Sequence, residues 1–355
     1  MSKKNTLPRD TASKPPVSEK NKNQAENSKK RLIRKLKITA IAVGSLIVLL
    51  ILADLIAAAV TIHTWTHPEK TRWNYDETPA SVGLDYHSFS VETENGTVRG
   101  WKIAAQTPIG DDAEEWIEAT EYSDKTVILA PNYDSNRQLM KDMGGIDYYA
   151  EWCNAGFNVI VFDWTGSGIS DGTKNVFTLD KTEELKAVVA FAEEETKASY
   201  IAIQSFGFSC YPAAQVAAES DSVDALILDS CYESFSQIFF GNLGNWTGLN
   251  FSPVKETIQF LFPIVTGVDA ESASLTAAVK SMKNKAIFFI QGGNDEQFGT
   301  AGAESLYNLC KSDNNVDRWV PDGVLHLRAR SYDRDDYFNR ILNFLNDSYE
   351  ENRTA

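Results

Sequence analysis

Short apolar runs recur along the chain from residue 86 to residue 320, and longer segments with helical periodicity separate most of them. Residues 86–103 alternate polar and apolar positions on both sides of Glu94-Asn95-Gly96, which predicts a β-hairpin. Six further runs have the length of buried strands: 126–130, 159–162, 201–203, 225–228, 286–290 and 317–320. This rhythm predicts an α/β fold with a mostly parallel eight-stranded sheet and helices on both faces.

An unbroken apolar segment occupies residues 38–62 and contains a single charge, Asp54. At about 1.5 Å per residue, a helix of this length exceeds the roughly 30 Å hydrocarbon core of a bilayer. We therefore expect one transmembrane helix. A cleaved signal peptide cut near Ala57-Ala58-Ala59 is the alternative, but the segment is longer than the about 7 to 15 apolar residues usual there.

Charge differs strongly between the two sides of this segment. Residues 1–37 contain 12 Lys and Arg against three acidic residues and few large apolar ones, which predicts a disordered basic tail. The positive-inside bias places that tail in the cytoplasm and the rest of this single-pass chain outside the cell membrane. With the tail's +9 and Asp54 removed from the net charge of −15, residues 63–355 carry −23. Such a field disfavours nucleic acid as a partner.

The cysteines and histidines do not follow a metal-binding pattern. Cys153, Cys210, Cys231 and Cys310 show no C-x-x-C or Cys/His ligand spacing, so we expect no metal site and no cofactor. Cys210 and Cys231 each follow a predicted strand. A disulfide between them is the alternative to buried free thiols, which are the commoner outcome.

Three motifs at the ends of predicted strands carry a family resemblance. They are residues 162–172, Phe-Asp-Trp-Thr-Gly-Ser-Gly-Ile-Ser-Asp-Gly; residues 292–298, Gly-Gly-Asn-Asp-Glu-Gln-Phe; and residues 323–326, Gly-Val-Leu-His. Over roughly residues 85–347 the chain resembles the α/β-hydrolase superfamily, most closely its monoacylglycerol-lipase-like and serine-aminopeptidase-like branch. The resemblance implies that Asp295 is the catalytic acid and His326 the catalytic histidine, in the chain order nucleophile, acid, histidine.

The nucleophile elbow of this superfamily, Gly-x-Ser-x-Gly, is degenerate in this chain. After the run 201–203 the sequence reads Ser205-Phe206-Gly207-Phe208-Ser209, with glycine where the resemblance places the serine. Ser205 and Ser209 satisfy the need for small residues on both sides of Gly207, so we expect Gly207 to occupy the nucleophile position and to supply no nucleophile. Other frames stay open: Ser209 as the nucleophile, or else Ser205 or Cys210.

The loop after the run 126–130 departs from the superfamily as well. The resemblance calls for His-Gly followed by another glycine, whose backbone N–H groups help to stabilise an oxyanion. The candidates here are Asn132 and Tyr133, together with Phe208, which follows the nucleophile position. Pro131 offers no N–H, and Asp134 adds negative charge where negative charge would develop. Losing one oxyanion donor costs about 3 kcal/mol, which argues against efficient acyl transfer.

Residues 232–280 interrupt the strand–helix rhythm and are a candidate lid. Its aromatic residues either pack on the core or line an apolar substrate channel: Phe235, Phe239, Phe240, Trp246, Phe251, Phe260 and Phe262. The expected organisation is a tail (1–37), a transmembrane helix (38–62), a linker (63–84), one α/β-hydrolase domain (85–348) and a short tail (349–355).

Three functions compete on this evidence. The first is a membrane-anchored pseudo-hydrolase that binds a small apolar or acyl ligand without turnover. The alternative is an active hydrolase of acyl esters or peptide-type amides that uses Ser209 or a water activated by His326. A third hypothesis is a cell-surface protein whose lid aromatics bind another protein.

Overall fold

The computed structural model describes residues 19–70, 77–108, 116–117, 122–138, 144–248 and 252–354. The chain divides into two compact units, residues 1–56 and residues 57–355. Helix α1 (Glu19–Thr66) forms the described part of the first unit and continues into the second. Among the described helices, α1 alone is long and apolar enough to cross a membrane by its length and composition, with a mean hydropathy of 2.7 in its most apolar window.

Helix α1 begins well before the apolar segment predicted at 38–62. Residues 19–37, predicted as part of a disordered tail, are helical, because Lys, Arg, Glu, Gln and Ala in this stretch are good helix formers. Residues 1–18 of that tail lie outside the described part of the chain. The division into tail, transmembrane segment, linker and domain stays a prediction.

An eight-stranded mixed sheet forms the centre of the second unit, with strand order β1-β2-β6-β5-β7-β8-β9-β10. The first two strands are antiparallel to their neighbours and the rest are parallel. This confirms the fold class predicted from the sequence. The strands are β1 (His87–Thr93), β2 (Gly96–Ile103), β5 (Lys125–Ala130), β6 (Asn158–Asp163), β7 (Tyr200–Phe206), β8 (Ala225–Asp229), β9 (Ala286–Ile290) and β10 (Asn315–Trp319).

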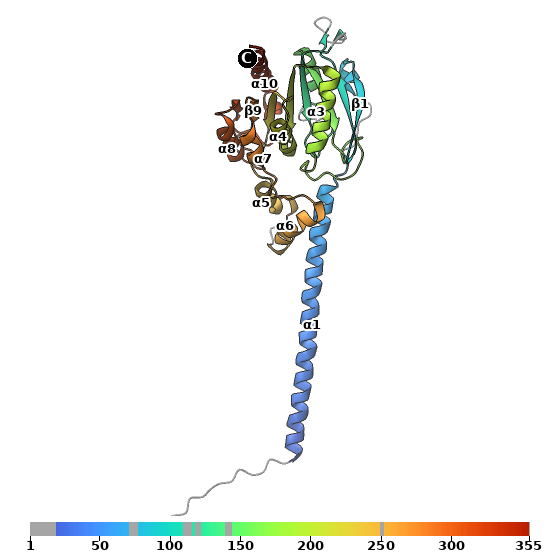
Figure 1. Cartoon of the computed structure of the whole chain (residues 1–355). Helices are drawn as coiled ribbons and strands as arrows, with labels where there is room; N and C mark the ends of the chain where they lie inside the picture. The colour runs from blue at the N-terminus through green and yellow to red at the C-terminus, as the bar shows by residue number, and fades with distance from the viewer. Residues whose placement is uncertain are drawn as a thin grey trace, which may run out of the picture. The chain divides into compact units, whose positions relative to one another are not determined.

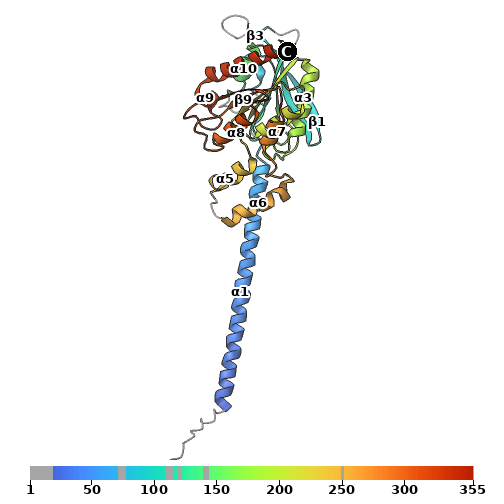
Figure 2. The same cartoon turned by 60° about the vertical axis from the view of Figure 1, so that its left-hand side comes forward.

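Alternate residues of the strands point into two separate apolar cores. Ile128 and Ile160 belong to the core on one face, and Val127 and Val161 belong to the core on the other. Period-two alternation of this kind is what a sheet buried on both faces requires. Helices α3 and α10 lie on opposite sides of the sheet in Figure 2. The helices around the sheet are α2 (Asp147–Asn154), α3 (Thr182–Thr196), α4 (Cys210–Glu219), α8 (Ala301–Cys310), α9 (Ala329–Tyr332) and α10 (Arg334–Thr354).

The last helix runs further than the predicted domain end at residue 348. The Tyr349 ring packs edge-on against Tyr200 with ring centroids 5.5 Å apart, and the Ser348 hydroxyl bonds the Tyr200 hydroxyl at 3.0 Å. These contacts hold α10 in helical form past residue 348. A small antiparallel ribbon of β3 (Thr107–Pro108) and β4 (Trp116–Ile117) is an addition that the apolar pattern does not predict.

The segment between β8 and β9 is helical, as expected for residues 232–280. It contains α5 (Phe235–Thr247), α6 (Ser252–Thr266) and α7 (Leu275–Ser281), and α5 and α6 lie beyond the end of the sheet in Figures 1 and 2. Most of its aromatic residues pack in the core: Phe235, Phe239, Phe240 and Phe262. Phe260 is exposed, and Phe251 lies outside the described residues.

Candidate functional site

A tight turn joins β7 to the following helix at Gly207. A single 3₁₀ turn (Gly207–Ser209) lies between the strand and α4, and Gly207 has a φ of +58°, in the left-handed region that glycine adopts at little cost. A Cβ added at Gly207 would lie 2.8 Å from Oδ1 of Asn132. The space that a side chain would need at this turn is therefore already occupied.

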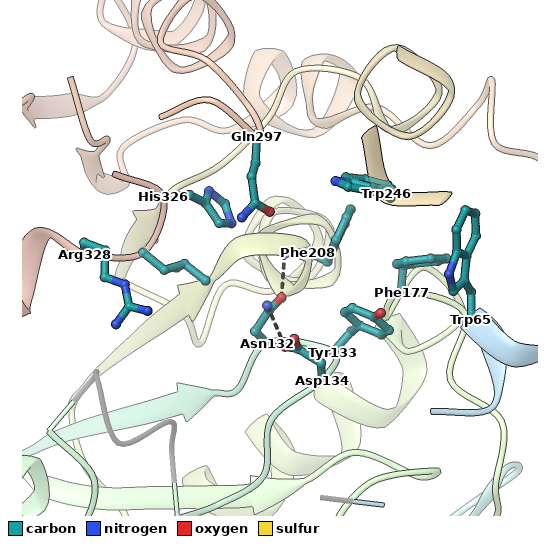
Figure 3. A pocket seen from close by; sticks show the side chains of 11 residues that line it. Trp65, Asn132, Tyr133, Asp134, Phe177, Phe208, Trp246, Gln297, His326 and Arg328 are labelled. Atoms are coloured by element: carbon teal, nitrogen blue, oxygen red, sulfur yellow. Dashed lines mark hydrogen bonds between the residues drawn. The ribbon is translucent and has the colours of Figure 1, made fainter. Parts of the chain in front are cut away.

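Asn132 holds the backbone amide that follows Gly207. Its Oδ1 accepts a hydrogen bond from the N–H of Phe208 at 3.0 Å, and its Nδ2 donates to Oδ1 of Asp134 at 2.9 Å. Figure 3 shows both bonds, with Asn132 reaching from the loop after β5 toward Phe208. The Phe208 N–H is therefore bonded to Asn132 and is not available to the carbonyl oxygen of a ligand.

The other nucleophile candidates lie inside the protein. The Ser209 hydroxyl donates toward the carbonyls of Ala130 and Phe206, each at 2.9 Å, and it accepts from the Phe206 N–H. Ser205 lies within hydrogen-bond distance of the Ile227 carbonyl, at 3.2 Å, and of the Cys210 thiol. All three residues are fully buried. The hydrogen bonds of these side chains go to core groups and not to His326, whose imidazole bonds Asp295.

Asp295 and His326 do come together. Nδ1 of His326 lies 2.7 Å from Oδ2 of Asp295. The other carboxylate oxygen of Asp295 accepts the backbone N–H groups of Gln297 and Phe298, at 2.9 and 2.8 Å. The Phe298 ring packs edge-on against the imidazole, with ring centroids 4.3 Å apart. The acid therefore fixes both the imidazole and the turn that follows β9.

A cavity of about 360 Å³ lies over the turn at Gly207. Its wall combines aromatic and polar side chains: Trp65, Asn132, Tyr133, Asp134, Phe177, Phe208, Trp246, Gln297, His326, Leu327 and Arg328. Phe177 and Leu327 have φ values of +51° and +55°, which are strained for residues with a side chain. Strained backbone of this kind concentrates at sites where ligands bind.

No protein-family model and no curated protein matches the chain. Among solved structures, the Pyrococcus furiosus esterase Pf2001 superposes with a TM-score of 0.63 at 21% identity, covering 80% of this chain and 98% of the esterase. An α/β hydrolase from Penicillium, GrgF, superposes with a TM-score of 0.54 at 16% identity, covering 75% and 99%. The chain has the α/β-hydrolase fold. The finer branch named from the sequence stays a prediction.

In the α/β-hydrolase fold, the N–H of the residue after the nucleophile helps to form the oxyanion hole. Phe208 holds that place if Gly207 is the elbow residue, and its N–H is bonded to Asn132. Asp134 lines the cavity. Desolvation by the surrounding protein raises the pKa of its carboxyl, and the electrostatic attraction of His326 opposes that rise. Burial raises the pKa of Tyr133 to about 12, so its hydroxyl stays neutral.

A buried network of hydrogen bonds connects the loop that contains His326 to the end of β8. The Leu327 N–H donates to the Ser230 hydroxyl at 3.0 Å, and that hydroxyl donates to Asp229 at 3.0 Å. The Tyr337 hydroxyl donates to the second oxygen of Asp229 at 2.6 Å. Burial raises the pKa of Asp229 to about 6, although these hydrogen bonds oppose the shift. The role of Asp229 could not be predicted from the sequence, because nothing there distinguishes it from any other residue at a strand end.

Trp65, at the end of α1, is a residue of the cavity wall that the sequence pattern does not predict. Ala58 and Ile62 of the same helix are fully buried in the core, and the Asn175 N–H donates to the Thr66 carbonyl at 2.8 Å. The Trp65 ring meets Trp246 with centroids 6.3 Å apart. The end of the apolar helix is therefore part of the folded domain and of the cavity wall.

Among the described residues, no group of three or more His, Cys, Asp or Glu side chains is arranged to hold a metal ion. The four cysteines are free and buried, which confirms free thiols at Cys210 and Cys231 in place of a disulfide. Burial raises the pKa of Cys210 well above its usual value, so its thiol stays protonated.

Proposed function

We propose that this chain is a membrane-anchored protein of the α/β-hydrolase fold that binds a small apolar or acyl ligand without hydrolysing it. The observation that carries the proposal is the turn at Gly207. The residue has the left-handed conformation of an elbow, and the Asn132 amide fills the space beside it and takes the Phe208 N–H. A site of this kind lacks the nucleophile, and one of its oxyanion donors, the Phe208 N–H, is already bonded.

The remaining features fit a tethered binding domain. The apolar part of α1 is the anchor, the basic residues before it stay in the cytoplasm, and the acidic domain lies outside the cell membrane. The segment 232–280 acts as a lid, since Trp246 of this segment lines the cavity. The aromatic wall of the cavity supplies apolar contact surface for the ligand.

Hydrolysis by activated water is the second candidate, and the intact pair of Asp295 and His326 favours it. An imidazole held at 2.7 Å by a buried carboxylate is oriented as a general base would be. His326 also lines the cavity. Catalysis by Ser209 has less support, because its hydroxyl is bonded to two carbonyls in the core.

The test is hydrolysis by the full chain in a maltoside detergent, assayed with p-nitrophenyl esters of two to eight carbons and with aminoacyl p-nitroanilides. Wild type and His326→Ala are compared at equal concentration, so that any turnover that depends on the imidazole appears as a difference. We expect equal background rates from the two proteins. A wild-type rate that falls to background in His326→Ala would establish the hydrolase. Binding of butyryl and hexanoyl amides, followed by tryptophan fluorescence, tests the ligand class separately.

A further inference from the structure

The cavity has two chemically unlike ends. Trp65, Trp246 and Tyr133 are half-buried aromatic residues at one end, and His326 and Arg328 lie at the other (Figure 3). The exposed carboxylate of Asp134 lies between them, next to Tyr133 along the chain. The aromatic end therefore has ring surfaces that a ligand can touch and a negative charge beside them.

The aromatic rings are arranged as walls rather than as a flat stack. The indole planes of Trp65 and Trp246 make an angle of 85°, with centroids 6.3 Å apart. Tyr133 is held by Phe177 and Phe208, at centroid distances of 4.6 and 5.5 Å. The face of an aromatic ring carries partial negative charge. A cation within about 6 Å of such a ring is attracted to it, most strongly by tryptophan.

The polar groups of this loop favour positive charge in the ligand. Where the fold normally offers N–H groups to a developing negative charge, Pro131 has no N–H and Asn132 occupies that of Phe208. Asp134 then adds a carboxylate that is exposed to the cavity. A cationic group placed at this end would be attracted by the Asp134 carboxylate, which an uncharged group would not be.

We propose that the cavity binds an organic ammonium ion, with a methylated ammonium head held by Trp65, Trp246 and Tyr133 and paired with Asp134. Methyl groups on nitrogen suit aromatic walls, because they spread the charge over an apolar surface. The inference rests on the proposed binding function and adds an ammonium head to its apolar or acyl ligand. His326, Gln297 and Arg328 offer hydrogen-bond partners to the remainder of the ligand at the other end.

The test is isothermal titration calorimetry on the full chain in maltoside detergent, which itself carries no ammonium group. Choline is compared with 3,3-dimethyl-1-butanol, which has the same shape and no charge. We expect choline to bind at least about tenfold more tightly. Asp134→Asn should weaken choline by about tenfold and leave the alcohol unchanged. Asp347→Asn, which removes an exposed carboxylate of α10 that does not line the cavity, is the matched control.

Equal affinity for choline and the alcohol, no binding of choline, or an unchanged choline affinity in Asp134→Asn would each overturn the inference. The comparison of choline with 3,3-dimethyl-1-butanol uses only the wild-type protein, so its result holds even if a variant fails to fold. Butyrylcholine separates the two proposals: its hydrolysis by wild type and not by His326→Ala would contradict the proposed function and leave cation selectivity intact. In nanodiscs, competition with choline by phosphatidylcholine and not by phosphatidylglycerol would identify a lipid headgroup as the source of the ammonium ion.

Discussion

The two halves of the site differ in how far they keep the arrangement of a hydrolase. Nδ1 of His326 lies 2.7 Å from the buried Asp295 carboxylate, and the imidazole lines the cavity, as a general base held by an acid would do. Across the cavity, Gly207 has no side chain, and Asn132 fills the space beside it. Under the proposed function, the acid–histidine pair remains although the group that it would serve is absent, so the pair by itself is weak evidence for turnover.

The acid–histidine half has structural reasons to persist. The Asp295 carboxylate accepts two backbone N–H groups of the turn after β9, and Gln291 donates to its other oxygen at 2.5 Å. The imidazole of His326 packs on Phe298. These contacts stabilise the loops whether or not a proton is ever transferred.

The largest effect is expected for Gly207→Val, which should lower the free energy of unfolding by about 3 kcal/mol. A β-branched residue is strained at a φ of +58°, and its Cβ would overlap Asn132. Gly156→Val is the matched control, because Gly156 also has a positive φ, +81°, but no atom lies within 4 Å of an added Cβ. Urea denaturation measures both. Equal losses in the two variants would show that Asn132 does not fill the elbow.

The structural role of the intact half is tested by Asp295→Ala and His326→Ala. We expect Asp295→Ala to cost about 2 kcal/mol, because it leaves the N–H groups of Gln297 and Phe298 without their acceptor. His326→Ala should cost less than about 1 kcal/mol, since the imidazole bonds one partner and packs on one ring. Thermal unfolding of the two variants checks the order. A larger loss in His326→Ala would contradict the structural explanation.

The network under His326 predicts a pH dependence of stability. The pKa of Asp229 is raised to about 6 in the folded protein by burial, against an ordinary value near 4. Between these values the folded state binds more protons than the unfolded state, so this group lowers the stability as pH rises from about 4 to about 6. The loss is of the order of 2 kcal/mol. Asp229→Asn should remove it; the same pH profile in variant and wild type would contradict the assignment.

The smallest effect concerns the coupling of Asn132 to Gly207. Gly207→Ser should destabilise the protein, and Asn132→Gly in the same chain should recover about 1 kcal/mol of that loss, because the smaller residue vacates the space. A double-mutant cycle on the two single variants and the double variant measures the coupling energy. Additive effects would place the two side chains out of contact.

The sheet could be predicted from the sequence because each buried strand is a short apolar run. Residues 286–290 were predicted as a strand and form β9 with the same bounds, and the hairpin around Asn95 pairs as expected. Local pattern was sufficient for these features. Asp295 and His326 could be proposed as partners through the family resemblance, which places an acid and a histidine after these strand ends.

The cavity could not be predicted in the same way. The rings of Trp65 and Trp246 are in contact although the two residues lie far apart in the sequence. No periodicity in the sequence relates them. The hydrogen bond from the Phe208 N–H to Asn132 depends on how the loop after β5 and the turn after β7 are placed at the strand ends. A shift of one residue in either segment would remove this bond. The expected alternatives Ser205 and Ser209 could not be separated from Gly207 until their hydroxyl partners were known.

The absence of a working nucleophile is tested most directly by labelling the full-length wild-type chain with a fluorophosphonate, followed by peptide mapping by mass spectrometry. This reagent reacts with a serine that is activated by a neighbouring base. We expect no labelled serine in protein that unfolds cooperatively, and the same result in His326→Ala. Labelling at Ser209 or Ser205 that disappears in His326→Ala would show a working nucleophile and contradict the proposed function.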